Sequence, residues 1–147
     1  ICLEEGQIKP ELSTWGFPRF GAKGVIINAR FETADSRPMF KKSLHTRRCL
    51  VPSTGFYEWS QSGIKTKYRF NLPNDHTLYM AGIFNEFQGD NKFVILTTSA
   101  NNSIADVHNR MPVILPKEMA DDWILSEEFA LSYLHATMPV LQREVSA

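Results

Sequence analysis

The middle of the chain alternates between short apolar runs and clusters of turn-forming residues, a pattern that predicts β-strands. Residues 56–60 (FYEWS) alternate aromatic and polar side chains, as a half-buried strand does, and residues 65–72 are expected to pair back with them as a hairpin. Residues 77–87 and 92–98 flank a glycine-containing turn and predict a second hairpin. Further strands are expected at residues 24–30, 49–51 and 111–115, with another around Cys2.

Strands dominate the middle of the chain, and helical signals lie mainly towards its ends. Proline near the first turn favours helices over residues 37–44 and 116–125, because a first-turn N–H has no helical partner to lose. Ser126 is expected to cap a helix over residues 126–135, and residues 99–107 are expected to begin a short helix. The order of elements predicts an α+β fold: a bent, mainly antiparallel β-sheet or barrel-like core with short peripheral helices.

Length and composition narrow the class of protein. The 147 residues suffice for one domain and are too few for two ordinary ones, so a single domain over residues 1–147, present as a monomer, is expected. Hydrophobic residues make up 43% and charged residues 22%, which is typical of a folded globular chain. Sixteen basic and sixteen acidic residues cancel, so a nucleic-acid site would need local clusters of Arg and Lys. No apolar run reaches about 18 residues, and no membrane-spanning helix is predicted.

Few sequence signals point to chemistry. No phosphate-binding loop, dinucleotide-binding glycine motif or nucleophilic serine motif is present. His45, His76 and His135 have no partner pattern and are interpreted as surface residues. No spacing of His, Cys, Asp and Glu suits a metal site, so neither a metal nor another cofactor is expected.

Three polar residues are candidates for a catalytic site. Asn28 ends an apolar strand and should point to the same side as Arg30, since alternate residues of a strand share a face. Glu58 stands between two aromatic residues, where desolvation would raise its pKa towards neutrality. His108 lies where a short helix is expected to meet a strand, a suitable place for a proton carrier. Each also has a plainer interpretation: a solvated strand end, a glutamate on the wet face, and a hydrogen-bonded structural histidine.

Basic and aromatic residues are interleaved along the chain. Trp15 precedes Arg30 and Phe31, and Arg48 follows another arginine. Aromatic faces stack on bases and arginines pair with phosphates, so this pattern suits single-stranded nucleic acid. The same pattern is common in ordinary β-sheet cores. Composition and spacing alone therefore leave an α+β domain with a possible polar site.

Several motifs together resemble one family. They are residues 15–18 (WGFP), 28–33 (NARFET), 48–52 (RCLVP) running into 55–59 (GFYEW), and 108–115 (HNRMPVIL). In this order and near this spacing they resemble the SRAP family, the SOS response-associated peptidases. The resemblance implies capture of abasic sites in single-stranded DNA by an N-terminal cysteine, whose amine and thiol form a thiazolidine crosslink, with self-processing peptidase activity and a strand-cleaving, lyase-like activity.

The resemblance also implies roles for individual residues. Asn28 would orient the sugar or the N-terminal amine, Glu58 would move protons to the amine and sugar, and His108 would assist opening of the deoxyribose. Arg30 and Arg110 match positions that hold DNA phosphates. Trp15 and Phe31 are expected to contact bases, and Arg48 is grouped with the DNA-binding residues.

The cysteines depart from the family pattern. Cys2 is preceded by Ile1 and followed by Leu3, and it lies 13 residues before Trp15, so it is not expected to be the nucleophile. Cys49 is expected to be a buried, inert thiol. The natural protein is expected to carry some tens of residues upstream, beginning with Met-Cys-Gly.

Other functions stay open from the sequence. If the N-terminal cysteine is truly absent, the domain would be a non-catalytic single-stranded DNA-binding module. A third possibility is a thiol peptidase acting on other proteins. Family resemblance and the lack of export signals predict a bacterial, cytoplasmic and nucleoid-associated protein.

Overall fold

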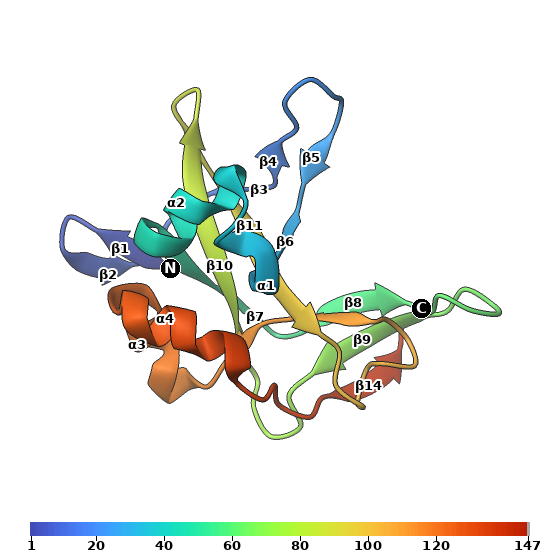
Figure 1. The fold of residues 1–147 in the computed structure, drawn as a ribbon. Coiled ribbons are helices and arrows are strands. Elements are labelled where there is room, and N and C mark those ends of the chain that lie inside the picture. The colour runs from blue at the N-terminus through green and yellow to red at the C-terminus, as the bar shows by residue number, and fades with distance from the viewer. Residues whose placement is uncertain (147) are drawn as a thin grey trace.

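The computed structural model describes residues 1–146, whose strands form one large sheet and two small ones. The large sheet is nine-stranded, with β12 (Arg110–Pro112), β11 (Asp90–Ser99), β10 (Leu78–Phe87), β7 (Arg48–Ser53), β1 (Cys2–Glu4) and β2 (Gln7–Lys9) in that spatial order (Figure 1). Off this path, β13 (Ile114–Leu115) pairs with β10, while β3 (Thr14–Trp15) and β6 (Asn28–Arg30) pair in parallel with β11.

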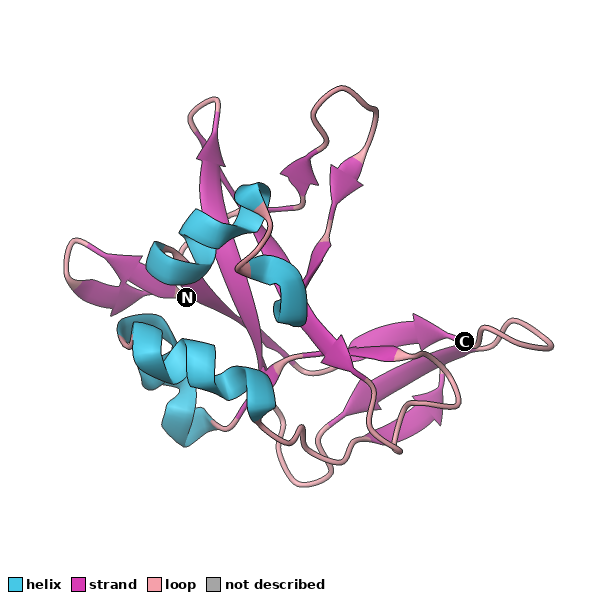
Figure 2. Cartoon of the chain, viewed as in Figure 1, coloured by secondary structure: helices cyan, strands magenta, loops and turns pink. Residues whose placement is uncertain are grey.

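The two small sheets extend from the large one. One contains β8 (Phe56–Trp59), β9 (Lys67–Asn71) and β14 (Gln142–Val145), and the other pairs β4 (Phe17–Pro18) with β5 (Val25–Ile26). Figure 2 shows the strands of β8, β9 and β14 grouped away from the helices, beyond the end of β11. Most pairings are antiparallel, which confirms the predicted α+β class and its mainly antiparallel sheet.

Helices lie against the large sheet. The short α1 (Phe31–Ala34) packs on β11 and β6, α2 (Pro38–Thr46) packs on β10 and β7, and α3 (Ala120–Leu125) packs on β7 and β1 (Figure 1). The last helix, α4 (Glu127–Ser132), begins after Ser126, whose side chain accepts the N–H of Phe129 as predicted for a cap. Short 3₁₀ turns, η1 (Lys117–Met119) and η2 (Tyr133–His135), complete the C-terminal helical region.

The hairpin of β10 and β11 runs through the core. Its loop has positive φ at both Gln88 (55°) and Gly89 (86°), which matches the twist of a two-residue hairpin turn. Ile83 of β10 and Leu96 of β11 are fully buried. Each such side chain removed from water contributes about 1.5–3 kcal/mol.

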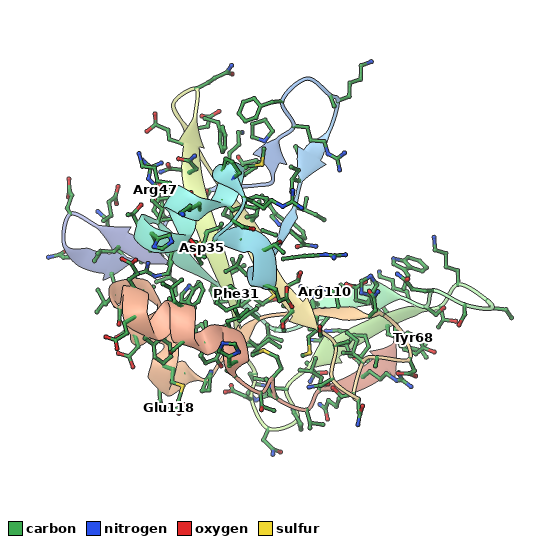
Figure 3. The ribbon with its side chains drawn as sticks, viewed as in Figure 1. Phe31, Asp35, Arg47, Tyr68, Arg110 and Glu118 are labelled. Carbon is green, nitrogen blue, oxygen red and sulfur yellow. The ribbon has the colours of Figure 1, made fainter. Side chains whose placement is uncertain are left out.

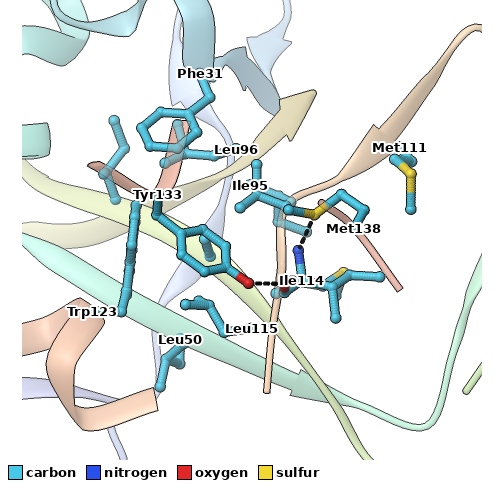
Figure 4. Close-up of a cluster of buried hydrophobic side chains, with 14 of the residues drawn as sticks. Phe31, Leu50, Ile95, Leu96, Met111, Ile114, Leu115, Trp123, Tyr133 and Met138 are labelled. Atoms are coloured by element: carbon cyan, nitrogen blue, oxygen red, sulfur yellow. Dashed lines mark hydrogen bonds between the residues drawn. The ribbon is translucent and has the colours of Figure 1, made fainter. Parts of the chain in front are cut away.

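Buried aromatic residues tie the helices to the sheet. Trp123 of α3 is fully buried and donates its indole N–H to the carbonyl of Cys49, 3.0 Å away. The Tyr133 hydroxyl donates to the carbonyl of Ile114 at 2.9 Å, in the same cluster of apolar side chains (Figure 4). These bonds satisfy polar atoms that would otherwise be costly to bury.

One predicted helix is wrong. Residues 102–107 form consecutive turns instead. Asn101 accepts hydrogen bonds from the N–H and hydroxyl of Ser103 and donates to the carbonyls of Met138 and Pro139. An Asn that binds nearby backbone in this way competes with helix formation.

Candidate functional site

A cleft of about 810 Å³ lies where β6, β8 and the start of β12 meet. Asn28 of β6, Glu58 of β8 and His108, just before β12, all line this cleft. These residues are far apart in sequence, and the structure brings them together on one concave surface. Their expected convergence is therefore found, while their chemical roles stay predictions.

The β6 strand positions Asn28 and Arg30. It pairs in parallel with β11, with Ala29 opposite Leu96. Ala29 is buried, whereas Asn28 and Arg30 are exposed on the opposite face of the strand and line the cleft. The alternation read from the sequence is thus the alternation of the folded strand.

Glu58 is the half-buried carboxyl of the cleft. It lies on β8 between the exposed side chains of Tyr57 and Trp59, so the strand alternation turns it the other way. Burial raises the pKa of Glu58, because the charged form loses hydration, and the nearby charge of His108 partly lowers that pKa again. A carboxyl with a raised pKa can release and accept a proton closer to neutrality than an ordinary glutamate.

The His108 ring is oriented by the backbone of Arg110. The N–H of Arg110 donates to Nδ1 of His108 at 3.0 Å, and the carbonyl of Arg110 lies 3.1 Å from the same nitrogen. The N–H can donate to Nδ1 in one tautomer and the carbonyl can accept from Nδ1–H in the other, so the backbone of Arg110 holds this edge of the ring in either case. The ring is therefore held in one orientation within the cleft.

Arg110 is fixed by an acidic partner that the motif analysis did not single out. Its two terminal nitrogens donate to the two carboxylate oxygens of Glu32 at 2.9 and 2.7 Å, and one also donates to the carbonyl of Thr97 at 2.7 Å. This contact lowers the pKa of Glu32. Figure 3 shows Arg110 near the end of β11, beside the strands that form the cleft. Only the position of Glu32 within the 28–33 motif hinted at this pairing.

Trp15 forms part of the cleft wall. Its indole N–H donates to the carbonyl of Ile27 at 2.8 Å, and its ring stacks on Phe93 with the centroids 6.4 Å apart. The side chain is still 49% exposed. A ring that is fixed in orientation yet open to solvent suits stacking on a flat ligand.

Two residues expected to contact DNA are instead buried. Phe31 is 4% exposed and packs edge-on against Trp123, 5.8 Å between centroids, because the chain turns into α1 directly after Arg30 (Figure 4). Arg48 is 6% exposed. Its guanidinium donates to backbone carbonyls at the ends of α2 and α3, namely Leu44, His45, Trp123 and Ile124. Both expectations were wrong: Phe31 belongs to the core and Arg48 joins two helices.

Neither cysteine lines the cleft. Cys2 and Cys49 are both buried and line a separate, smaller cavity of about 200 Å³. Burial is the main reason that the pKa of Cys2 rises to about 11 and that of Cys49 to about 12. Such thiols are almost entirely protonated at neutral pH, so both are poor nucleophiles.

Residues 1–146 hold neither a metal-binding cluster nor a membrane span of the helical kind. No group of three or more His, Cys, Asp and Glu side chains in this part of the chain is arranged to hold a metal ion. Within the same residues, no helix is long and apolar enough to cross a membrane.

The fold and the cleft define a class: an α+β domain whose bent antiparallel sheet brings an amide, a carboxyl and an imidazole into one cleft. The chain belongs to the SOS response associated peptidase (SRAP) family, whose model matches residues 3–145. The resemblance seen in the sequence motifs is thereby confirmed.

Several curated proteins are similar in sequence. "Abasic site processing protein YoqW" of Bacillus subtilis is 34% identical over 120 residues, covering 77% of this chain and 54% of that protein. "Abasic site processing protein YedK" of Escherichia coli is 33% identical over 119 residues, again covering 77% of this chain and 54% of the relative. The chain thus spans about half the length of the curated relatives it matches.

Solved structures share the fold. A phage-related protein of Bordetella bronchiseptica superposes with a TM-score of 0.80 at 29% identity, covering 98% of this chain and 74% of that one. A protein from Bacteroides thetaiotaomicron gives a TM-score of 0.70 at 31% identity, covering 80% of this chain and 57% of that one.

Proposed function

We propose that this domain recognises and processes abasic sites in single-stranded DNA, with Asn28, Glu58 and His108 as the working groups of the cleft. The observation that carries the proposal is their convergence in one cleft, where burial raises the pKa of Glu58. The similar proteins of Bacillus subtilis and Escherichia coli are named abasic site processing proteins, which agrees with this substrate.

The three groups suit a ring-opened abasic sugar. Its aldehyde and hydroxyl groups need hydrogen-bond donors and acceptors and a group that exchanges protons near neutrality. Asn28 supplies both a donor and an acceptor, and Glu58 supplies the exchanging proton. His108 supplies a ring that can carry a proton, and its Nδ1 edge is held by the backbone of Arg110.

We include a covalent step in the proposal. The α-amine of an N-terminal cysteine attacks the sugar aldehyde and water leaves to give an imine. The thiol then adds to the imine carbon, and its proton passes to the nitrogen, which closes a thiazolidine. Cys2 cannot supply the amine, because its nitrogen is in a peptide bond with Ile1, and Cys49 is buried. The step therefore needs a cysteine other than these two. Self-processing peptidase and lyase-like activities belong to the same proposal.

The DNA path in this proposal follows the cleft rim. Arg30 is exposed and, among residues 1–146, forms no ion pair, so its full charge is open to a phosphate. The charge of Arg110 is shared with Glu32, and this arginine is a weaker phosphate ligand as long as that pair holds. Trp15 provides the stacking surface for a base next to the abasic site.

Non-covalent binding gives a direct test. Fluorescence anisotropy would compare two single-stranded oligonucleotides of the same sequence. One carries a tetrahydrofuran abasic analogue at one position, and the other carries a normal base there. We expect tighter binding of the abasic analogue, and loss of that preference in Asn28→Ala. The control is Glu86→Gln, which changes an exposed carboxyl on β10 that does not line the cleft. Equal affinity for the two oligonucleotides in the unmodified chain would contradict the proposal.

A non-covalent binding module is the second candidate. It is favoured by one observation, the burial and raised pKa of both thiols of this chain. The binding experiment above supports either candidate, whereas crosslinking to DNA separates them.

A further inference from the structure

Cys2 and Cys49 lie directly opposite each other on neighbouring antiparallel strands. The register of β1 and β7 pairs Cys2 with Cys49. The next pair, Ile1 and Leu50, exchanges both of its backbone hydrogen bonds, at 2.8 and 2.9 Å. In an antiparallel ladder such pairs alternate with non-hydrogen-bonded pairs, so Cys2 and Cys49 form a non-hydrogen-bonded pair, in which side chains approach most closely.

This geometry is compatible with a disulfide. The Cα atoms of a non-hydrogen-bonded pair lie about 4.5 Å apart, and disulfides span Cα separations of about 4.4–6.8 Å. Side chains directly opposite in a ladder share a face of the sheet, so both thiols point to the same side. The Cys49 sulfur now lies over Gly82 of β10, where an added Cβ would be 2.9 Å from it. Rotation about the Cα–Cβ bond of Cys49 moves that sulfur towards Cys2.

A small reagent can approach the pair through the cavity of about 200 Å³ that both cysteines line. The carboxyl of Glu11 lines the same cavity and accepts a hydrogen bond from the Cys2 thiol at 3.2 Å. This acid stands where it can hold the thiol protonated and slow its reaction.

We propose that Cys2 and Cys49 form a site of reversible oxidation, at which a low-molecular-weight disulfide converts the two thiols into a cross-strand disulfide. Cys2 attacks the reagent and forms a mixed disulfide, releasing one reagent thiol. Cys49 then attacks the Cys2 sulfur and releases the second. The two thiol protons leave with the two released thiols, and the two electrons lost by the cysteines reduce the reagent.

The disulfide would fasten the edge of the large sheet. The β1–β2 hairpin lies at the end of the strand order, and it is joined to β7 only by the short stretch formed by the Cys2–Cys49 pair and the neighbouring Ile1–Leu50 hydrogen bonds. A bond at this pair holds the hairpin to the sheet even when the ladder frays. We expect oxidation to raise the midpoint of thermal unfolding and to slow proteolysis within residues 1–12.

Glu11 sets the rate in this proposal. Its hydrogen bond and negative charge add to burial in raising the pKa of Cys2 to about 11. Only the thiolate attacks, so at pH values below this pKa the rate of oxidation should increase about tenfold for each unit by which the pH is raised. Removing the charge in Glu11→Gln should accelerate oxidation several-fold. Glu5→Gln in the same hairpin is the matched control, because Glu5 is exposed and does not act on Cys2.

The experiment titrates the folded chain with glutathione disulfide and reduced glutathione, blocks free thiols by alkylation, and identifies the products by intact mass and peptide mapping. We expect loss of two hydrogens, a peptide linking Cys2 to Cys49, and an equilibrium at least tenfold more favourable in the folded than in the urea-unfolded chain. Cys2→Ala should form no intramolecular disulfide. A stable mixed disulfide with glutathione, thiols that stay alkylatable, or an equal equilibrium in the unfolded chain would overturn the proposal.

Discussion

Glu58 is an ionisable side chain that is half-buried, and its burial should lower the free energy of unfolding at neutral pH. Its folded-state pKa lies above its ordinary value because burial disfavours the carboxylate. The stability associated with the protonated form is therefore fully present below the unfolded pKa of about 4.3 and is lost as pH rises through the folded pKa. A neutral amide of the same shape avoids this loss.

We therefore expect Glu58→Gln to be more stable than the unmodified chain at neutral pH, by an amount that shrinks towards about pH 4. Urea unfolding at several pH values measures this difference. In a protein that carries the N-terminal cysteine, the same substitution should slow formation or reversal of the crosslink while leaving affinity for DNA nearly unchanged, because a proton carrier acts on rate. A stability difference that does not vary with pH would return Glu58 to an ordinary surface glutamate.

Residue alternation was predictable, but the environment of single residues was less so. Asn28 and Arg30 share a strand face, as the sequence indicated, because a two-residue period needs only local information. Phe31 was misplaced because the strand ends one residue earlier and a helix begins. Arg48 was misplaced because two of its carbonyl partners lie 75 and 76 positions away. Long-range partners of this kind leave no periodic signal in the sequence.

At the scale of elements, hairpins were easier to predict than the segments between them. The two hairpins β8–β9 and β10–β11 follow from strand alternation and turn residues. The strand expected over residues 111–115 is broken at Val113, whose N–H donates to Leu96 while its carbonyl accepts from Ala81. The break lets β12 pair with β11 and β13 with β10. Only the tertiary structure decides such a change of partner.

His45 joins three elements that the sequence left unconnected. Its two ring nitrogens lie 2.5 Å from Asp35, before α2, and 2.6 Å from Glu127 of α4. These two hydrogen bonds, to Asp35 first and then to Glu127, raise the pKa of His45. A raised pKa means that the added stability is fully present below the unfolded pKa of about 6.5 and is lost as pH rises through the folded value.

We expect the thermal unfolding midpoint to fall on passing from about pH 6 to about pH 9, and the fall to be smaller in His45→Gln. Differential scanning measurements over this range test the expectation. His76→Gln is the matched control, because His76 is exposed and forms none of these contacts. Identical pH profiles for the unmodified chain and His45→Gln would show that the bridge does not stabilise the fold.

At the scale of the whole molecule, charge is balanced and the proposed DNA site depends on a few local cations. Loss of one phosphate contact lowers the slope of log affinity against log salt by about 0.7 for a single strand. We expect Arg30→Ala to lower the slope by about this amount, and Arg110→Ala to lower it less, because Glu32 already shares that charge. Anisotropy titrations at several salt concentrations give both slopes, with Arg19→Ala as a control in the β4–β5 loop. An unchanged slope in both variants would reject this DNA path.

An assay for covalent capture of abasic DNA by the whole chain tests most directly which residue is the nucleophile. A thiazolidine needs an amine and a thiol on one residue, yet Cys2 follows Ile1 in the chain and burial raises the pKa of Cys49 to about 12. We therefore expect these 147 residues to form no denaturation-resistant adduct with abasic single-stranded DNA, although we expect them to bind it. Denaturing electrophoresis after incubation measures this directly. A shifted band that disappears in Cys2→Ala but persists in Cys49→Ala would show that Cys2 is the nucleophile after all, through its thiol alone.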